Sequence, residues 1–205
     1  MNSTKQRILA TSLKLFNEEG LPNVSLRRIA DELNISVGNL TYHFNKKEVI
    51  EETLYYELVA LIDKEFGPIP DEELSLKILK DLTGKLFSYL YEYRFIFIDL
   101  VYIMRTNDTI RAHYSELVTL RKIQCTHFFT QLIPLGILRE EELPNEYENL
   151  YIRNQLTFDF FLSSLVITKE GINEVSIEKH QTIYLQSIYP YLTEKGKVEF
   201  FKVIS

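Results

Sequence analysis

The chain has 205 residues, of which 45% are apolar and 25% charged, and its formal net charge is −6. This balance excludes a disordered chain and allows a substantial hydrophobic core. Residues 1–47 hold seven Lys or Arg and four Asp or Glu, so they carry +3 and the remaining residues carry −9. A basic segment on an acidic body is typical of a DNA-binding module joined to a domain that does not bind DNA.

The sequence predicts a cytoplasmic protein without a membrane partner. Cys125 is the only cysteine, so no intrachain disulfide can form and a reducing compartment is expected. The first seven residues are polar and lack the apolar core of a signal peptide. The longest apolar stretch, 95–104, is interrupted by Asp99 and is shorter than the roughly 18 residues that a membrane span needs.

The first 47 residues predict three short helices. Apolar residues recur at helical spacing over 4–19, and Gly20 ends that helix. Ser25 is a good N-cap for a second helix, because the apolar side chains of 26–33 then fall on one face.

A tight turn is expected to join the second helix to the third. Asn34 occupies the reversal, and Asn tolerates the left-handed conformation better than most residues. Ser36 then caps the third helix. A fourth helix, from about 46 to 66, would connect this head to the rest of the chain. Residues 67–70, Gly-Pro-Ile-Pro, predict a linker corner.

The rest of the chain also reads as helical, without a convincing strand. The sequence therefore predicts an all-α protein, with a helix-turn-helix head over 1–47 and a helical bundle over 48–205. Pro190 is expected to kink or divide the last helix. The other helices are expected at about 71–93, 95–105, 106–133, 146–169 and from 176 onward, with a charged connector at 139–145.

The start of the third helix has the chemistry that a DNA-reading helix needs. Such a helix needs small or polar residues where its end approaches base edges. Val37 can touch a thymine methyl, Gly38 removes bulk and Asn39 can bond adenine. Periodicity alone would also fit an ordinary helical hairpin. The residues predicted to face bases, phosphates or a neighbouring groove are Ser25, Arg27, Arg28, Ser36, Val37, Gly38, Asn39, Thr41, Tyr42, His43, Lys46 and Lys47.

These residues also carry a family resemblance over roughly the first 50 positions. The pattern closely resembles the N-terminal DNA-binding domain of TetR/AcrR transcriptional regulators. Two positions depart from it: Asn34 replaces the usual turn Gly, and Thr41 stands where a Tyr commonly contacts the DNA backbone. The matching positions are Ile8, Phe16, Gly20, Ser25, Ile29, Ala30, Ile35, Ser36, Gly38, Leu40, Tyr42, His43, Phe44, Lys47 and Glu48. The positions that are typical DNA contacts in that family match Ser25, Arg28, Val37, Asn39, Tyr42, His43 and Lys47.

The resemblance implies a ligand pocket in the helices over about 71–133, and residues 95–136 look loosely like one branch of such regulators. Aromatic stripes are nevertheless more often core than pocket. Asp99 and Asp159 each interrupt an apolar run, which suits either a cationic or hydroxylated ligand or a structural pair with Arg121 or Arg153. The pocket candidates are Phe87, Tyr91, Phe95, Asp99, Tyr102, Tyr114, His127, Phe128, Phe158 and Asp159.

The resemblance also implies a homodimer. Residues 156–167 are apolar on nearly all sides, so that helix must be covered by its own domain and by a partner, or else form the centre of a monomeric bundle. The candidate dimer face comprises Leu156, Phe160, Ser163, Ser164, Ile167, Tyr184 and Ile188.

The functional expectation is a ligand-responsive repressor that binds a pseudo-palindromic DNA operator as a dimer. A small, largely apolar or aromatic effector would release it. The alternative is an all-helical carrier of a lipophilic ligand, or a small enzyme, with an incidental head. The four His residues show no metal spacing, and no Gly-rich phosphate loop is present. We therefore expect no catalysis, no cofactor and no metal.

Overall fold

The computed structural model describes residues 3–65 and 74–204. Within these ranges no β-strand is formed, apart from an isolated antiparallel bridge between Leu138 and Leu192, so the all-α prediction is confirmed. The linker corner predicted at 67–70 lies outside the described residues. The helices are α1 (Thr4–Glu19), α2 (Leu26–Leu33), α3 (Val37–His43), α4 (Lys47–Glu65), α5 (Leu76–Glu92), α6 (Arg94–Ile98), α7 (Leu100–Thr106), α8 (Asp108–Gln131), α9 (Glu146–Thr168), α10 (Glu174–Gln186) and α11 (Glu194–Ile204), with 3-10 helices η1 (Leu21–Asn23) and η3 (Tyr189–Tyr191).

The turn between α2 and α3 has the predicted chemistry. The Ser25 Oγ accepts a hydrogen bond from the backbone N–H of Arg28 at 3.1 Å and thereby caps α2. Asn34 ends α2 in the left-handed conformation, with φ 53°. The Ser36 Oγ accepts from the N–H of Asn39 at 3.1 Å and caps α3. Both caps and the left-handed turn fix the angle at which α3 leaves the head.

Two predicted helices are divided in the structure. The helix expected at 95–105 is broken at Asp99, which has φ −100° and ψ 18° and separates α6 from α7. At that break the Asp99 side chain bonds to the head instead of facing solvent or a cavity. The last predicted helix is divided around Pro190 into α10, η3 and α11, as expected for a residue without a backbone N–H.

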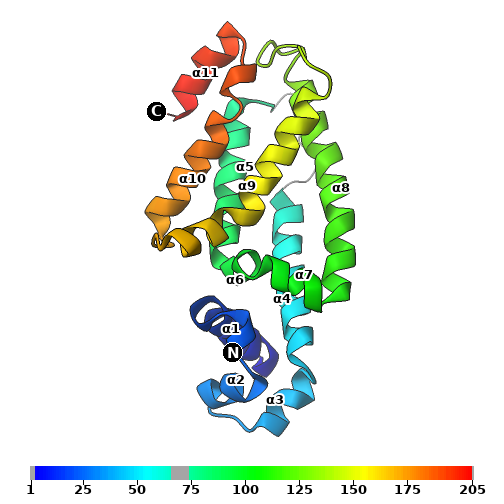
Figure 1. The fold of residues 1–205 in the computed structure, drawn as a ribbon, viewed down its shortest axis with the longest axis vertical. Helices are drawn as coiled ribbons and strands as arrows, with labels where there is room; N and C mark the ends of the chain where they lie inside the picture. The colour runs from blue at the N-terminus through cyan, green and yellow to red at the C-terminus, as the bar shows by residue number, and fades with distance from the viewer. Residues whose placement is uncertain (1–2, 66–73, 205) are drawn as a thin grey trace.

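The head and the body are joined by a continuous core. In Figure 1, α1 to α3 form one end of the molecule, and α4 runs from this head into the body beside α8. The Phe16 ring of α1 packs against the Phe95 ring of α6 with centroids 5.2 Å apart. A second buried cluster lies farther from the head, where the Tyr147 ring packs between those of Phe129 and Tyr191.

Candidate DNA interface and body cavity

The start of α3 projects into solvent. Val37, Gly38 and Asn39 are exposed, while Leu40 on the next position is fully buried against the head core. Tyr42, one turn further, is 87% exposed, and its ring meets the ring of His43 edge-on at 5.2 Å. The head therefore anchors α3 by one apolar face and presents the predicted reading residues on the other.

Gly38 is not required by packing within this chain. A Cβ atom built at this position would approach only the Ser36 Oγ, at 3.9 Å, which is ordinary van der Waals contact. Glycine lowers the stability of a helix interior by roughly 0.5–1 kcal/mol relative to alanine. A glycine here thus has no internal steric reason, whereas a close approach of the α3 backbone to another molecule would supply one.

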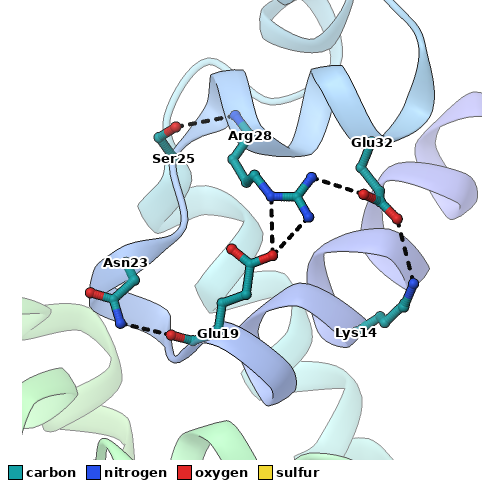
Figure 2. Close-up of polar contacts among 6 residues, drawn as sticks. All are labelled: Lys14, Glu19, Asn23, Ser25, Arg28 and Glu32. Carbon is teal, nitrogen blue, oxygen red and sulfur yellow. Dashed lines mark hydrogen bonds and ion pairs between the residues drawn. The ribbon is translucent and has the colours of Figure 1, made fainter.

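Arg28 is held inside the head. Its Nε and Nη2 donate to the Glu19 Oε1 at 3.0 and 2.7 Å, and its Nη1 donates to the Glu32 Oε2 at 2.8 Å. Lys14 reaches the other oxygen of Glu32 at 3.4 Å. The Arg28 guanidinium, followed by Lys14, lowers the pKa of Glu32. Figure 2 shows this network tying α2 to α1, so Arg28 pairs with two carboxylates within the head. The DNA contact that the resemblance implies for Arg28 stays a prediction.

The other basic residues of the head differ in how free they are. The Lys47 Nζ donates to the Leu21 carbonyl at 3.0 Å, so Lys47 too is engaged within the protein. Lys46 is exposed, and the Arg27 side chain is 84% exposed with a long 3.9 Å ion pair to Asp31. Thr41 donates its hydroxyl to the Gly38 carbonyl at 3.2 Å. Arg27 and Lys46 are therefore more exposed than Arg28 and Lys47.

Hydrogen bonds fasten the head to both ends of α6. The Asn17 Nδ2 donates to the Glu92 carbonyl at 2.7 Å, and its Oδ1 accepts from the Phe95 N–H at 3.0 Å. At the other end of α6, the Asp99 carboxylate accepts from the Leu21 N–H at 3.0 Å. Any movement of this short helix therefore pulls directly on the end of α1.

A cavity of about 620 Å³ lies in the body. Its wall is formed mainly by aliphatic and aromatic side chains from α4, α5, α6, α8 and α9. Ile96 and Phe97 of α6 line it, and these two residues lie between the bonds that hold α6 to the head. The cavity thus shares both α4 and α6 with the connection to the head that carries α3.

The structure places four of the predicted pocket residues in this wall and six elsewhere. Tyr114, His127, Phe128 and Phe158 line the cavity. Phe87 and Phe95 are buried in the core, and Tyr102 is 41% exposed on the surface. Tyr91 stacks under the Arg94 guanidinium at 5.1 Å. Sequence periodicity identifies an apolar face but not whether packing fills the space beside it.

Neither predicted role, ligand contact or ion pair with an Arg, matches where Asp99 and Asp159 lie. Asp99 is outside the cavity wall and bonds to the Leu21 N–H, while burial raises its pKa. Asp159 lies behind the wall, where its carboxylate accepts from the Tyr114 hydroxyl at 2.5 Å and from the Gln155 Nε2 at 3.4 Å. Burial also raises the pKa of Asp159. In both cases neutral donors of the protein take the role that was expected of an Arg or a ligand.

Several wall residues were missed from the sequence. Tyr55, Leu58 and Ile62 of α4 line the wall and were not among the predicted pocket residues, although their spacing of three and four residues places them on one face. Asp63 and Arg121 were not linked either, because they are 58 positions apart and meet only in the tertiary structure.

Some of the predicted dimer-face residues are exposed, and others lie inside the protomer. Leu156, Phe160 and Ile167 are 55%, 43% and 79% exposed on α9, and Ser164 is exposed too. Ser163 instead donates its hydroxyl to the Phe97 carbonyl at 2.9 Å. Two candidates lie inside the protomer and are removed from the face. They are Tyr184, which lines the cavity, and Ile188, which is 3% exposed in the distal core.

Comparison with known families covers nearly the whole chain. A family model described as bacterial regulatory proteins of the tetR family matches residues 8–52. A second, the TetR model described as bacterial transcriptional repressor, matches residues 58–200. The chain belongs to the TetR family. It is a transcriptional regulator with an N-terminal DNA-binding domain, as the sequence resemblance predicted. Among the described residues, no helix combines the length and apolar character that crossing a membrane requires.

Relatives of this TetR-family chain agree in fold. A TetR-family regulator from Marinobacter aquaeolei shares 25% identity and a TM-score of 0.89, over 98% of this chain and 97% of that one. A protein from Saccharomonospora viridis described as a transcriptional regulator and solved with choline shares 22% identity and a TM-score of 0.70, over 93% and 97%. An HTH-type transcriptional regulator of Staphylococcus aureus is 42% identical over 59 residues, which span only 29% of this chain and 30% of that relative.

Proposed function

We propose that this chain is a repressor that binds a pseudo-palindromic operator as a homodimer and is released by a largely apolar ligand. The observation that carries the proposal is the shared use of α4 and α6. The same two helices line the body cavity and hold the head that presents α3. A ligand that binds one head position better than another shifts the head by linkage.

The reading residues are assigned by their exposure. Val37, Gly38 and Asn39 at the start of α3 would meet base edges in the major groove, and Tyr42 would lie against the backbone. Arg27 and Lys46, which are the more exposed cations, would contact phosphates. Arg28 and Lys47 would keep α2 and α4 in place.

The proposed dimer face is a stripe on α9 and α10. Ile152, Leu156, Phe160 and Ile167 recur on α9 at four- and seven-residue spacing and are each at least 42% exposed. Val175 and Ile183 add exposed apolar surface on α10. Such a stripe is unfavourable in water, and a second copy of the chain with the same stripe would cover it. A dimer also supplies the two heads that a palindromic operator needs.

The DNA-binding part of the proposal is tested by operator selection from random duplexes, followed by gel shifts over a salt series. We expect a selected site with two half-sites about one helical turn apart or a multiple of it. The double variant Asn39→Ala/Tyr42→Ala should lose about a hundredfold or more in affinity, because a base contact of Asn39 is worth about 1–3 kcal/mol and a hydrogen bond of Tyr42 to a charged phosphate about 1.5–3 kcal/mol.

The matched control for this experiment is Tyr102→Ala/Asn149→Ala, which removes the same two residue types from exposed positions of the body. Its DNA affinity should equal that of the wild type. Failure to select any DNA sequence, or equal losses of DNA affinity in both double variants, would contradict the operator proposal.

The dimer is tested by sedimentation of Phe160→Glu beside Phe201→Glu. Phe160 is 43% exposed on α9, and Phe201 is 54% exposed on α11, outside the proposed face. A charge at Phe160 should convert the dimer to a monomer, and the same charge at Phe201 should not. A wild-type protein that sediments as a monomer at every concentration would contradict the proposed dimer.

A further inference from the structure

An ion pair lies at the wall of the cavity, between α4 and α8. The Asp63 carboxylate of α4 accepts from the Arg121 guanidinium of α8, which also donates to the Gln124 Oε1 at 2.7 Å. All three residues line the cavity. Among the described lining residues, Arg121 is the only Lys or Arg and Asp63 the only carboxylate. This pair therefore supplies both of these charged groups to the described part of the wall.

The two members of the pair are unequally exposed. The Arg121 side chain is 15% exposed and the Asp63 side chain 53%. Asp63 can exchange its partner for water at little cost, because much of it is already hydrated. Arg121 is largely buried, so taking a carboxylate away from this cation is strongly unfavourable. An incoming anion would replace Asp63 beside Arg121, whereas an incoming cation would have to draw Asp63 away from it.

The Arg121 charge also acts on the interior of the cavity. Burial raises the pKa of Cys125 to about 11, and the Arg121 guanidinium opposes that shift. Burial also raises the pKa of Tyr151, again opposed by Arg121. Both residues line the cavity, so the positive charge is felt on its inner side.

Three hydroxyl groups of the wall are already engaged within the protein. The Tyr114 hydroxyl donates to Asp159, the Tyr151 hydroxyl donates to the Val118 carbonyl at 3.0 Å, and the Thr83 hydroxyl donates to the Leu79 carbonyl at 2.6 Å. These polar groups are used within the protein, and the aliphatic side chains around them favour an apolar occupant.

We propose that the effector is an amphiphile with an apolar body and one acidic head group, and that its carboxylate displaces Asp63 from the Arg121 guanidinium. This inference deepens the proposed function and rests on it. Asp63 lies near the end of α4, so its release from Arg121 removes a tie between α4 and α8. Because α4 begins at the head, that loss is a route from ligand binding to head movement.

The experiment compares matched head groups on the same body by isothermal titration calorimetry at pH 7.5. One set is dodecanoic acid, dodecan-1-ol and dodecylamine, and the other is the acid, methanol and methylamine derivatives of adamantane. In at least one set we expect the acid to bind about tenfold or more tightly than the alcohol, and more tightly than the amine. An alcohol or amine that binds as tightly as the acid in both sets, or no binding in either set, would overturn the proposal.

Three variants test whether the preference for the acid depends on the Asp63–Arg121 ion pair. Arg121→Gln should reduce the acid-over-alcohol preference to within about twofold, and Asp63→Asn should tighten acid binding about threefold or more by removing the competing carboxylate. Lys122→Gln is the matched control, because Lys122 is the neighbouring cation on α8, lies outside the cavity wall and pairs with Glu148 at 2.9 Å. A preference that survives Arg121→Gln, or that Lys122→Gln removes equally, would refute the role of Arg121.

DNA gel shifts on the same proteins separate this inference from the proposed function. Specific DNA binding that is released by the alcohol or amine but not by the acid would overturn the ligand class and leave the repressor intact. Acid binding that depends on Arg121, in a protein that selects no DNA sequence, would support the ligand class and overturn the repressor proposal.

Discussion

The head and the body differ in how completely side chains fill their interiors. The head fills its small interior with side chains such as Leu15, Phe16 and Leu40, each at most 1% exposed, and fixes its turns with caps and the Arg28 network. The body leaves about 620 Å³ open between helices that are apolar on the facing sides. The filled interior fixes the geometry of the head, whereas the open space leaves the facing side chains of the body fewer packing contacts.

A few hydrogen bonds connect the head to the body. Asn17 and Asp99 hold α6 to the head, and α6 turns Ile96 and Phe97 toward the cavity. These bonds connect the head to the cavity wall through α6, a helix of five residues.

The largest expected effect comes from a matched pair of core truncations. Leu15→Ala in the head should lower the free energy of unfolding by about 3–4 kcal/mol, because it opens a void in a filled core. Leu86→Ala in the cavity wall should cost about 1–2 kcal/mol, because one side of Leu86 already faces open space. Urea unfolding measures both. Equal losses would contradict the difference in packing.

The next effect concerns a carboxylate at the junction of head and body. Glu51 of α4 is 3% exposed, and burial raises its pKa from the ordinary 4.5 to about 7, opposed by Lys47 and Asn107 and assisted by Glu48 and Glu52. Its folded-state pKa is raised, so its ionisation lowers the free energy of unfolding as pH rises from about 4.5 to about 7. The full penalty, about 3 kcal/mol, applies above pH 7.

Glu51→Gln removes this ionisation. We expect the stability of the variant relative to the wild type to be greater at pH 8 than at pH 5, by up to about 3 kcal/mol. Urea unfolding at both pH values measures this difference. Glu116→Gln, at an exposed position on α8, is the control and should show no such difference. An identical pH dependence in Glu51→Gln and wild type would exclude Glu51 as its source.

A smaller effect tests the bridge itself. Asn17→Ala removes two hydrogen bonds between head and body, worth about 0.5–1.5 kcal/mol each. Hydrogen exchange should accelerate in α1 and at Phe95 but not in α9. Asn23→Ala, which removes one bond inside the head, to the Glu19 carbonyl at 2.7 Å, is the control and should leave exchange at Phe95 unchanged.

The smallest expected stability change separates folding from DNA reading. Gly38→Ala should raise the free energy of unfolding by about 0.5 kcal/mol, because the helical position has room for a Cβ. DNA affinity should nevertheless fall, since the added methyl would stand between α3 and the groove. Unchanged DNA binding in this variant would remove Gly38 from the interface.

Local chemistry made the head predictable. Ser25, Asn34 and Ser36 act on backbone groups within three or four positions of themselves, so their roles as caps and turn follow from the adjacent sequence. Exposure of Asn39 and Tyr42 follows in turn from the burial of Leu40. The ion pair of Arg28 with Glu19 did not follow from the adjacent sequence, because Glu19 lies on another helix, nine positions away.

The sequence by itself determined that the chain is all-α, where most helices begin and end, and which short helix faces outward from the head. These properties depend on periodicity and capping, which act over a few residues. Only the tertiary structure decided which aromatic residues fill the core and which surround open space. It also decided that Asp99 bonds to the head and that Asp63 meets Arg121. Those outcomes depend on how whole helices pack, and residues brought together from 58 or 78 positions apart leave no local pattern to read.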